Sequence, residues 1–216
     1  MRKYSGSMDG FGGDLHLPNS SARGLAGADE ICTAIAEEAM PGAGAKGWRA
    51  FLSTVTGPVH AIDRIGQGPW YDRLGRVVAL TKADLLNDRP NGADPAIIND
   101  LPNELGIPNH TDGKPGCTGD SCPDNHDTLT GTGKNGQLYK MDMATTCNDW
   151  TSKEPSGRPW CGHSWPRQGS GVNWMSSISE GGCAPGINLV EMGPAMTTTV
   201  GSGGGYGGIY CFALKP

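Results

Sequence analysis

The chain has 216 residues, a net charge of −5, and 35 glycines together with 16 prolines. The acidic balance argues against nucleic acid and anionic polysaccharide as the main partners, and the sequence contains no apolar run of about 18 residues that would span a membrane. The glycine and proline content favours many turns and long ordered loops over a helical bundle.

The segment 24–53 predicts a helix followed by a short buried strand. Small or apolar residues recur at the i, i+4 spacing that places them on one helical face: Ile31, Ile35 and Ala39, and Cys32, Ala36 and Met40. The acidic Asp29 and Glu30 suit the positive end of the helix dipole. Pro41 and Gly42 end the helix, and residues 48–53 read as the strand.

Further elements are expected downstream of this unit. Thr81 to Asp84 has the form of a capping box, which predicts a short helix over 83–87. Residues 89–135 are rich in Pro, Gly, Asn and Asp and too poor in apolar residues for a core of their own, so we expect a long irregular excursion rather than a domain. Strands are predicted at 76–80, 128–132, 137–143, 187–192 and 208–214.

The seven cysteines are spread along the chain, at positions 32, 117, 122, 147, 161, 183 and 211. None belongs to a C-x-x-C pair of the kind that binds zinc, and the wide spread is typical of a disulfide framework formed in an oxidising compartment. Because the count is odd, one thiol remains free or pairs with another chain. The spacing alone does not choose among the possible pairings.

Five motifs in the same order resemble endostatin, the C-terminal module of certain vertebrate collagens, and more closely its bacterial surface and secreted versions. They are D-L-H-L-P-N-S at 14–20, G-A-D-E-I-C with W-R-A-F-L-S within 27–53, R-V-V-A-L-T-K-A-D-L-L at 76–86, C-N-D-W-T at 147–151 and G-G-I-Y-C-F at 207–212. The resemblance implies an α+β, C-type lectin-like fold: a twisted mixed or antiparallel sheet, two helices and long loops. It also implies a single domain over 1–216, with an irregular insertion at about 88–135.

The resemblance implies a choice of disulfides as well. It pairs Cys32 with Cys211, which would tie the helix to the last strand, and Cys147 with Cys183. A bridge between Cys117 and Cys122 would then staple the inserted loop locally. Cys161 is left unpaired or intermolecular.

Two metal sites follow as hypotheses. Endostatin carries zinc, and His16 and Asp84 match two positions of its site, but the N-terminal histidines are absent here, and the alternative is a surface histidine and a helix-start aspartate. Hard oxygen ligands at short spacing on a glycine-rich loop suit calcium, although no EF-hand pattern is present and a solvated turn is the alternative. These calcium candidates are Asp112, Asp120, Asp124, Asn125 and Asp127.

Tryptophans in the loops are candidates for ligand binding. Trp160, Trp165 and Trp174 lie in a glycine-rich region where they could stack on a sugar ring or anchor a protein partner, although packing beneath a loop is the alternative. Trp48 and Trp150 belong to core-like motifs. Cys161 and His163 are close in sequence, but two residues of separation do not make a catalytic pair, so we expect no enzyme activity.

These observations predict a non-catalytic extracellular, cell-surface or periplasmic module. It would bind a glycan, matrix polymer or protein through the loops at 88–135 and 153–185, without a nucleic-acid partner and without strong heparin affinity. The alternative is a structural subunit of a surface layer, filament or matrix that assembles with copies of itself. A metal-dependent hydrolase is a third and weaker hypothesis. The first ten residues lack the apolar region of a signal peptide, so export would need a signal outside this numbering or another route.

Overall fold

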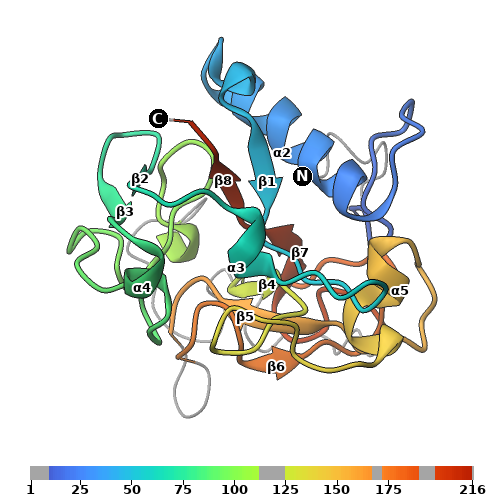
Figure 1. Cartoon of the computed structure of the whole chain (residues 1–216). Coiled ribbons are helices and arrows are strands. Elements are labelled where there is room, and N and C mark those ends of the chain that lie inside the picture. The colour runs from blue at the N-terminus through green and yellow to red at the C-terminus, as the bar shows by residue number, and fades with distance from the viewer. Residues whose placement is uncertain (1–9, 112–124, 167–171, 190–197, 216) are drawn as a thin grey trace.

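The computed structural model describes residues 10–111, 125–166, 172–189 and 198–215, which form a mixed α and β structure with few helices and small sheets (Figure 1). This arrangement agrees with the α+β class expected from the sequence. The helical elements are α2 (Gly24–Ala39), η1 (Ala43–Lys46), α3 (Ala61–Arg64), α4 (Lys82–Leu85), η2 (Asn109–Thr111), η3 (Met143–Thr146) and α5 (Cys147–Trp150). The strands are β1 (Trp48–Ala50), β2 (Trp70–Tyr71), β3 (Val77–Ala79), β4 (Asp127–Leu129), β5 (Trp160–His163), β6 (Ile178–Ser179), β7 (Gly205–Ile209) and β8 (Cys211–Ala213).

Helix α2 buries much of the face that its sequence predicts, including Ile31, Cys32, Ile35 and Ala36. It begins at Gly24, earlier than the acidic pair, so the expectation that Asp29 and Glu30 sit at the positive end of the dipole is wrong. The Asp29 carboxylate instead accepts a hydrogen bond from the Ala50 amide at 2.9 Å, and each of its oxygens accepts one from Nη2 of Arg64 at 2.8 Å. Asp29 therefore holds α2 against β1 and α3.

The strands form three sheets. β1 pairs with β8, β2 pairs with β3, and a four-stranded sheet has the order β6-β5-β4-β7. The β4–β5 pair is antiparallel, whereas β4 and β7 run parallel. Figure 1 shows α2 running alongside β1, with the four-stranded sheet below them. The predicted strand at 208–214 is divided between two sheets. β7 ends at Ile209 in the four-stranded sheet, and β8 begins at Cys211 and pairs with β1.

Two of the predicted strands do not form as such. The chain turns at 133–136, and residues 137–143 then make an isolated bridge between Leu138 and Thr132, followed by a hydrogen bond from the Tyr139 amide to the Gly131 carbonyl at 3.0 Å. In the described part of 187–192, Asn188 makes an isolated bridge to Gly205. The helix predicted after Thr81 is confirmed as α4, with both hydrogen bonds of the capping box present.

Both disulfides implied by the resemblance are present. Cys32 bonds to Cys211, and Cys147 bonds to Cys183. Both lie in one core cluster that also contains Trp150, while a second cluster surrounds Phe51 and Trp174. The first bridge fastens α2 to β8, and the second fastens α5 to the segment after β6.

The element α5 is a left-handed turn. Its four residues have φ values of 48, 55, 56 and 65°, in a region that costs an L-residue roughly 1–2 kcal/mol. The contacts that hold the turn include the disulfide at Cys147 and a hydrogen bond from Trp150 Nε1 to the Ser53 carbonyl at 2.8 Å. The Asp149 carboxylate also accepts from the Val55 and Thr56 amides at 2.7 and 2.9 Å. The C-N-D-W motif therefore has a structural role, as expected.

The stability that this turn contributes depends on pH through the Asp149 carboxyl. Burial alone would raise the pKa of the Asp149 carboxyl, but hydrogen bonds from Val55, Thr56 and Thr146 outweigh it and lower the pKa. A lowered folded-state pKa contributes stability above the unfolded value of about 3.9 that is lost as the pH falls through the folded value.

We expect Asp149→Asn to destabilise the protein by about 1 kcal/mol at neutral pH, a figure reduced for partial exposure of the carboxylate. The difference from wild type should shrink below about pH 4. Urea unfolding between pH 3 and pH 7 measures it, with the exposed Glu104→Gln as the control. An Asp149→Asn difference that stays constant across that range would contradict the assignment.

Candidate functional site

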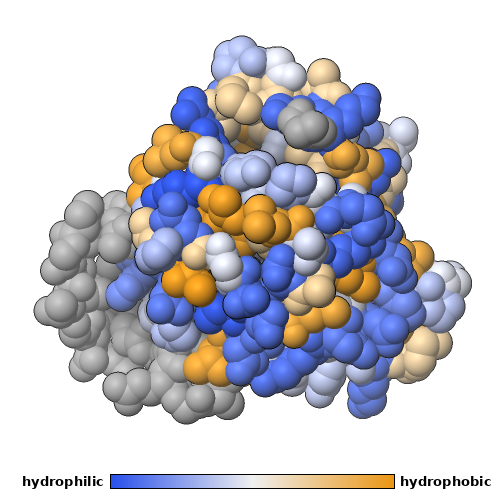
Figure 2. Space-filling model, turned by 60° about the vertical axis from the view of Figure 1, so that its left-hand side comes forward, coloured by the Kyte–Doolittle hydropathy of each residue, from blue (hydrophilic) through white to orange (hydrophobic). Residues whose placement is uncertain are grey.

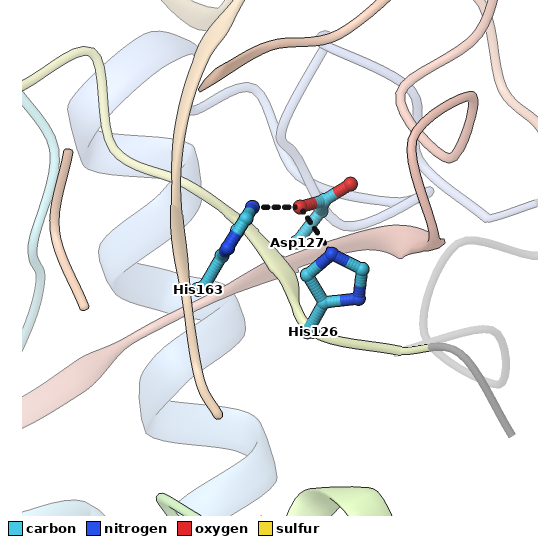
Figure 3. Close-up of side chains that lie close together, drawn as sticks. All are labelled: His126, Asp127 and His163. Atoms are coloured by element: carbon cyan, nitrogen blue, oxygen red, sulfur yellow. Dashed lines mark ion pairs between the residues drawn. The ribbon is translucent and has the colours of Figure 1, made fainter. Parts of the chain in front are cut away.

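Three buried polar side chains meet at the centre of the four-stranded sheet (Figure 3). The antiparallel register of β4 and β5 places Asp127 directly opposite His163, and directly opposed residues have Cβ atoms about 4.5–5.5 Å apart. His126 immediately precedes β4. Sheet pairing, rather than proximity in sequence, therefore brings the second histidine to the first two residues.

The two imidazoles converge on one carboxylate oxygen. Asp127 Oδ1 lies 2.9 Å from Nε2 of His163 and 3.3 Å from Nε2 of His126, as the dashed lines in Figure 3 show. The two imidazole rings meet edge to face at a centroid distance of 4.3 Å. All three residues are at most 3% exposed, so their interactions take place away from bulk water.

A second carboxyl group, that of Glu180, lies against this cluster. Glu180 is 1% exposed, and its Oε2 accepts hydrogen bonds from the Ser202 hydroxyl at 2.5 Å and the Gly203 amide at 2.7 Å. Burial, and then the neighbouring Asp127 charge, raise the pKa of the Glu180 carboxyl well above its usual value. Gly203 permits this close packing, because a Cβ there would lie 2.5 Å from Asp127 Oδ2.

Cys161 is a free, fully buried thiol on β5, two residues before His163. Burial, followed by the charges of Glu180 and Asp127, raises the pKa of the Cys161 thiol well above its usual value. Because the thiolate is the reactive form, this environment suits an inert core cysteine rather than a nucleophile. The thiol is unpaired, as expected, and its burial argues against the intermolecular alternative.

The three candidate tryptophans occupy different environments. Trp174 is 1% exposed and donates from Nε1 to the Leu85 carbonyl at 2.8 Å, so it lies in the core. Trp165 is also buried and stacks on His110 at a centroid distance of 4.1 Å. Trp160 keeps part of its ring accessible and stacks in parallel on Tyr139, at 3.8 Å and 3°. Of the three tryptophans, Trp160 is therefore the one whose ring is accessible to a ligand.

A cleft of about 350 Å³ extends from the end of α2 and the β2–β3 hairpin toward the buried cluster. Its lining includes Tyr71, Arg73, Asn103, Ser164 and Asp127. Figure 2 shows one face of the molecule, on which hydrophobic residues gather in several patches separated by hydrophilic ones. Of the three residues in the buried cluster, Asp127 is the one that lines the cleft.

The structure does not support the zinc site at His16 and Asp84. The His16 imidazole lies 3.2 Å from Asp14, whereas the Asp84 carboxylate accepts from the Thr81 amide and hydroxyl within the capping box of α4. Neither belongs to the described group of three potential metal ligands within 4.8 Å of one another. Each of the two residues thus has a partner of its own, and a zinc site at His16 and Asp84 stays a prediction.

The calcium candidates are separated between described and undescribed parts of the chain. Asp112, Asp120 and Asp124 lie outside the described residues, as do Cys117 and Cys122. Asp127 is described, but it faces two histidines in the sheet interior rather than a solvated loop. Asn125 is likewise buried and bonds to Asn109.

The His126–Asp127–His163 cluster was not predicted from the sequence. Its histidines are 37 positions apart (163 − 126), with no short ligand spacing, and a strand register supplies the contact.

Comparison with models of known protein families gives no match, and comparison with curated proteins gives none either. Within the described residues, no helix has the length and apolar character needed to cross a membrane. The two disulfides are typical of proteins that fold in an oxidising compartment.

Proposed function

We propose that this chain is a non-catalytic extracellular recognition module with a C-type lectin-like fold of the endostatin type. Three features support the proposal: the mixed α and β architecture, the two disulfides at the positions that the resemblance implies, and an exposed aromatic surface. In this proposal residues 1–216 form a single domain. Its ligand is a glycan, a matrix polymer or a protein, and neither nucleic acid nor heparin binds strongly to the acidic chain.

The stacked pair of Tyr139 and Trp160 is the observation that carries the proposal. Tyr139 is 42% exposed, and the ring of Trp160 supports it from below in a parallel stack. Trp160 is itself fixed by a hydrogen bond from its Nε1 to the Ser176 hydroxyl at 2.8 Å. A rigid aromatic face with a hydroxyl at its rim suits the apolar face of a pyranose ring or an apolar protein side chain, and ordering it on binding costs little entropy.

Tyr139→Ala should weaken binding to such a ligand by about 10-fold or more, because the side chain supplies the contact surface. Screening the wild-type protein on a glycan array and against matrix proteins identifies the ligand, and titration of the variants measures the loss. Tyr71→Ala is the matched control: Tyr71 is 52% exposed, and no aromatic ring stacks on it within the described part of the chain.

Equal losses from the two tyrosine variants would contradict an aromatic site at Tyr139, as would full retention of binding by Tyr139→Ala. Failure of the wild-type protein to bind any glycan or matrix protein would count against the recognition function itself. The buried thiol of Cys161 cannot form a disulfide to a second chain, and this removes one argument for the assembly alternative.

A further inference from the structure

The cluster in the four-stranded sheet has the donor atoms of a metal site. His126, Asp127 and His163 each offer one ligand atom, and these atoms all lie within 4.8 Å of one another. Tetrahedral ligands with bonds of 2.0–2.1 Å are separated by about 3.3 Å. The two distances to Asp127 Oδ1, 2.9 and 3.3 Å, are close to that separation. An ion could therefore be accommodated with small movements of the side chains.

The donor set favours a transition metal over calcium or magnesium. Two imidazole nitrogens and one carboxylate oxygen suit zinc, iron, nickel or copper, whereas calcium takes 6–8 oxygen ligands and magnesium an octahedron of oxygens. Zinc sites commonly combine histidine nitrogens with a carboxylate. The proposed ion differs from the calcium suggested for the acidic loop, although Asp127 belongs to both sets. The place differs from the zinc site suggested at His16 and Asp84.

The surroundings are arranged as expected around a bound cation. The Glu180 carboxyl contacts Asp127 and is itself held by Ser202 and Gly203, so it can orient the ligating carboxylate from outside the coordination shell. The two carboxyl groups thus share one buried region, where a divalent cation would stabilise the charge of the Asp127 carboxylate. Asp127 is among the residues that line the cleft, and its carboxylate is fully buried.

The scaffold fixes these ligands before any ion arrives. Asp127 and His163 lie on two strands paired directly with each other, and β4 is also paired with β7 on its other side. Ligands on paired strands need less ordering on binding than ligands on loops. The edge of the cluster is closed by Trp165, whose ring lies 4.8 Å from that of His126.

We propose that His126, Asp127 and His163 bind one divalent transition-metal ion, with zinc the preferred probe, and that Glu180 positions the Asp127 carboxylate. The ion would link β4 to β5 and so stabilise the strand that carries Trp160. The proposal is independent of the recognition function, because metal binding can be measured without any glycan or protein ligand.

The test uses the full chain with its disulfides intact and without a histidine tag. Metal analysis after dialysis against Zn²⁺ should find about one ion per chain. At a hundredfold excess over Kd, Zn²⁺ should raise Tm by roughly 5–10 °C, whereas Ca²⁺ should leave it unchanged. Substituting Co²⁺ should give a visible absorption spectrum of nitrogen and oxygen ligands without a thiolate band.

Asp127→Asn and His163→Gln should each abolish stoichiometric Zn²⁺ binding, and Glu180→Gln should weaken it by about 10–100-fold through its effect on Asp127. His16→Gln is the matched control, since this histidine is also beside an aspartate but lies outside the cluster. Near-ultraviolet circular dichroism checks that each variant folds. If a variant fails to fold, competition between Zn²⁺ and a chromophoric chelator on the wild-type protein still decides the question.

Wild-type protein that takes up no Zn²⁺ or Co²⁺ and shows no Tm shift would overturn the proposal and leave a hydrogen-bonded polar cluster. Zn²⁺ binding that survives Asp127→Asn and His163→Gln but is lost in His16→Gln would overturn it equally, by placing the ion elsewhere. If the cluster variants lose Zn²⁺ but still bind the glycan, the metal site is supported, and the recognition function is then judged by the Tyr139 experiment.

Discussion

Replacing Cys32 and Cys211 together by serine should lower the free energy of unfolding by about 5 kcal/mol. The bridge joins residues 179 positions apart, so removing it releases nearly the whole chain in the unfolded state. It also joins α2 to β8, an edge of the molecule where the β1–β8 pair has three residues in each strand.

Urea unfolding of the double variant at neutral pH measures the loss. The Cys147→Ser and Cys183→Ser double variant is the internal comparison: its bridge closes a separation of 36 residues, and the loop-entropy model gives about 4 kcal/mol. Since 5 kcal/mol is a large share of the stability of a typical domain, the Cys32 and Cys211 variant is expected to be partly unfolded at 37 °C. A smaller loss for this pair than for the other would show that unfolded-chain entropy does not dominate.

Local sequence patterns predicted the elements that depend on neighbouring residues. The i, i+4 face of α2 and the capping box of α4 both appear in the structure, because each needs contacts within a few residues. The disulfide pairing came from a family resemblance rather than from spacing. The turn before the predicted strand at 137–143 forms at 133–136, but the pairing after it is limited to the bridge between Leu138 and Thr132 and the hydrogen bond from the Tyr139 amide to the Gly131 carbonyl.

Local sequence patterns could not predict the candidate metal cluster, because its residues meet through strand pairing. Asp127 and His163 meet through the register of β4 and β5, and a register shift of one residue would point one of them to the other face of the sheet. Metal motifs that can be read from sequence, by contrast, keep their ligands on one helix or one loop. The same strand pairing places Cys161 opposite Leu129 and buries it. From the sequence alone, Cys161 was a candidate for pairing with another chain.

Trp150→Ala should cost about 3–5 kcal/mol, and the loss should fall at the upper end of that range. Trp150 is completely buried in the core cluster that contains both disulfides, so truncation leaves a large cavity. It also removes the donor to the Ser53 carbonyl, and an unsatisfied buried acceptor adds roughly 1–3 kcal/mol. The left-handed turn would lose one of the side-chain contacts that hold it.

Trp150→Phe separates these causes, because it keeps most of the ring volume and removes the indole N–H. We expect it to cost about half as much as Trp150→Ala. Trp160→Ala, in a half-buried ring of the same kind, should cost clearly less than either, and chemical denaturation compares all three. If Trp150→Ala cost no more than Trp160→Ala, the left-handed turn would not depend on the Trp150 side chain. The organising contact of the C-N-D-W motif would then be Cys147 rather than its tryptophan.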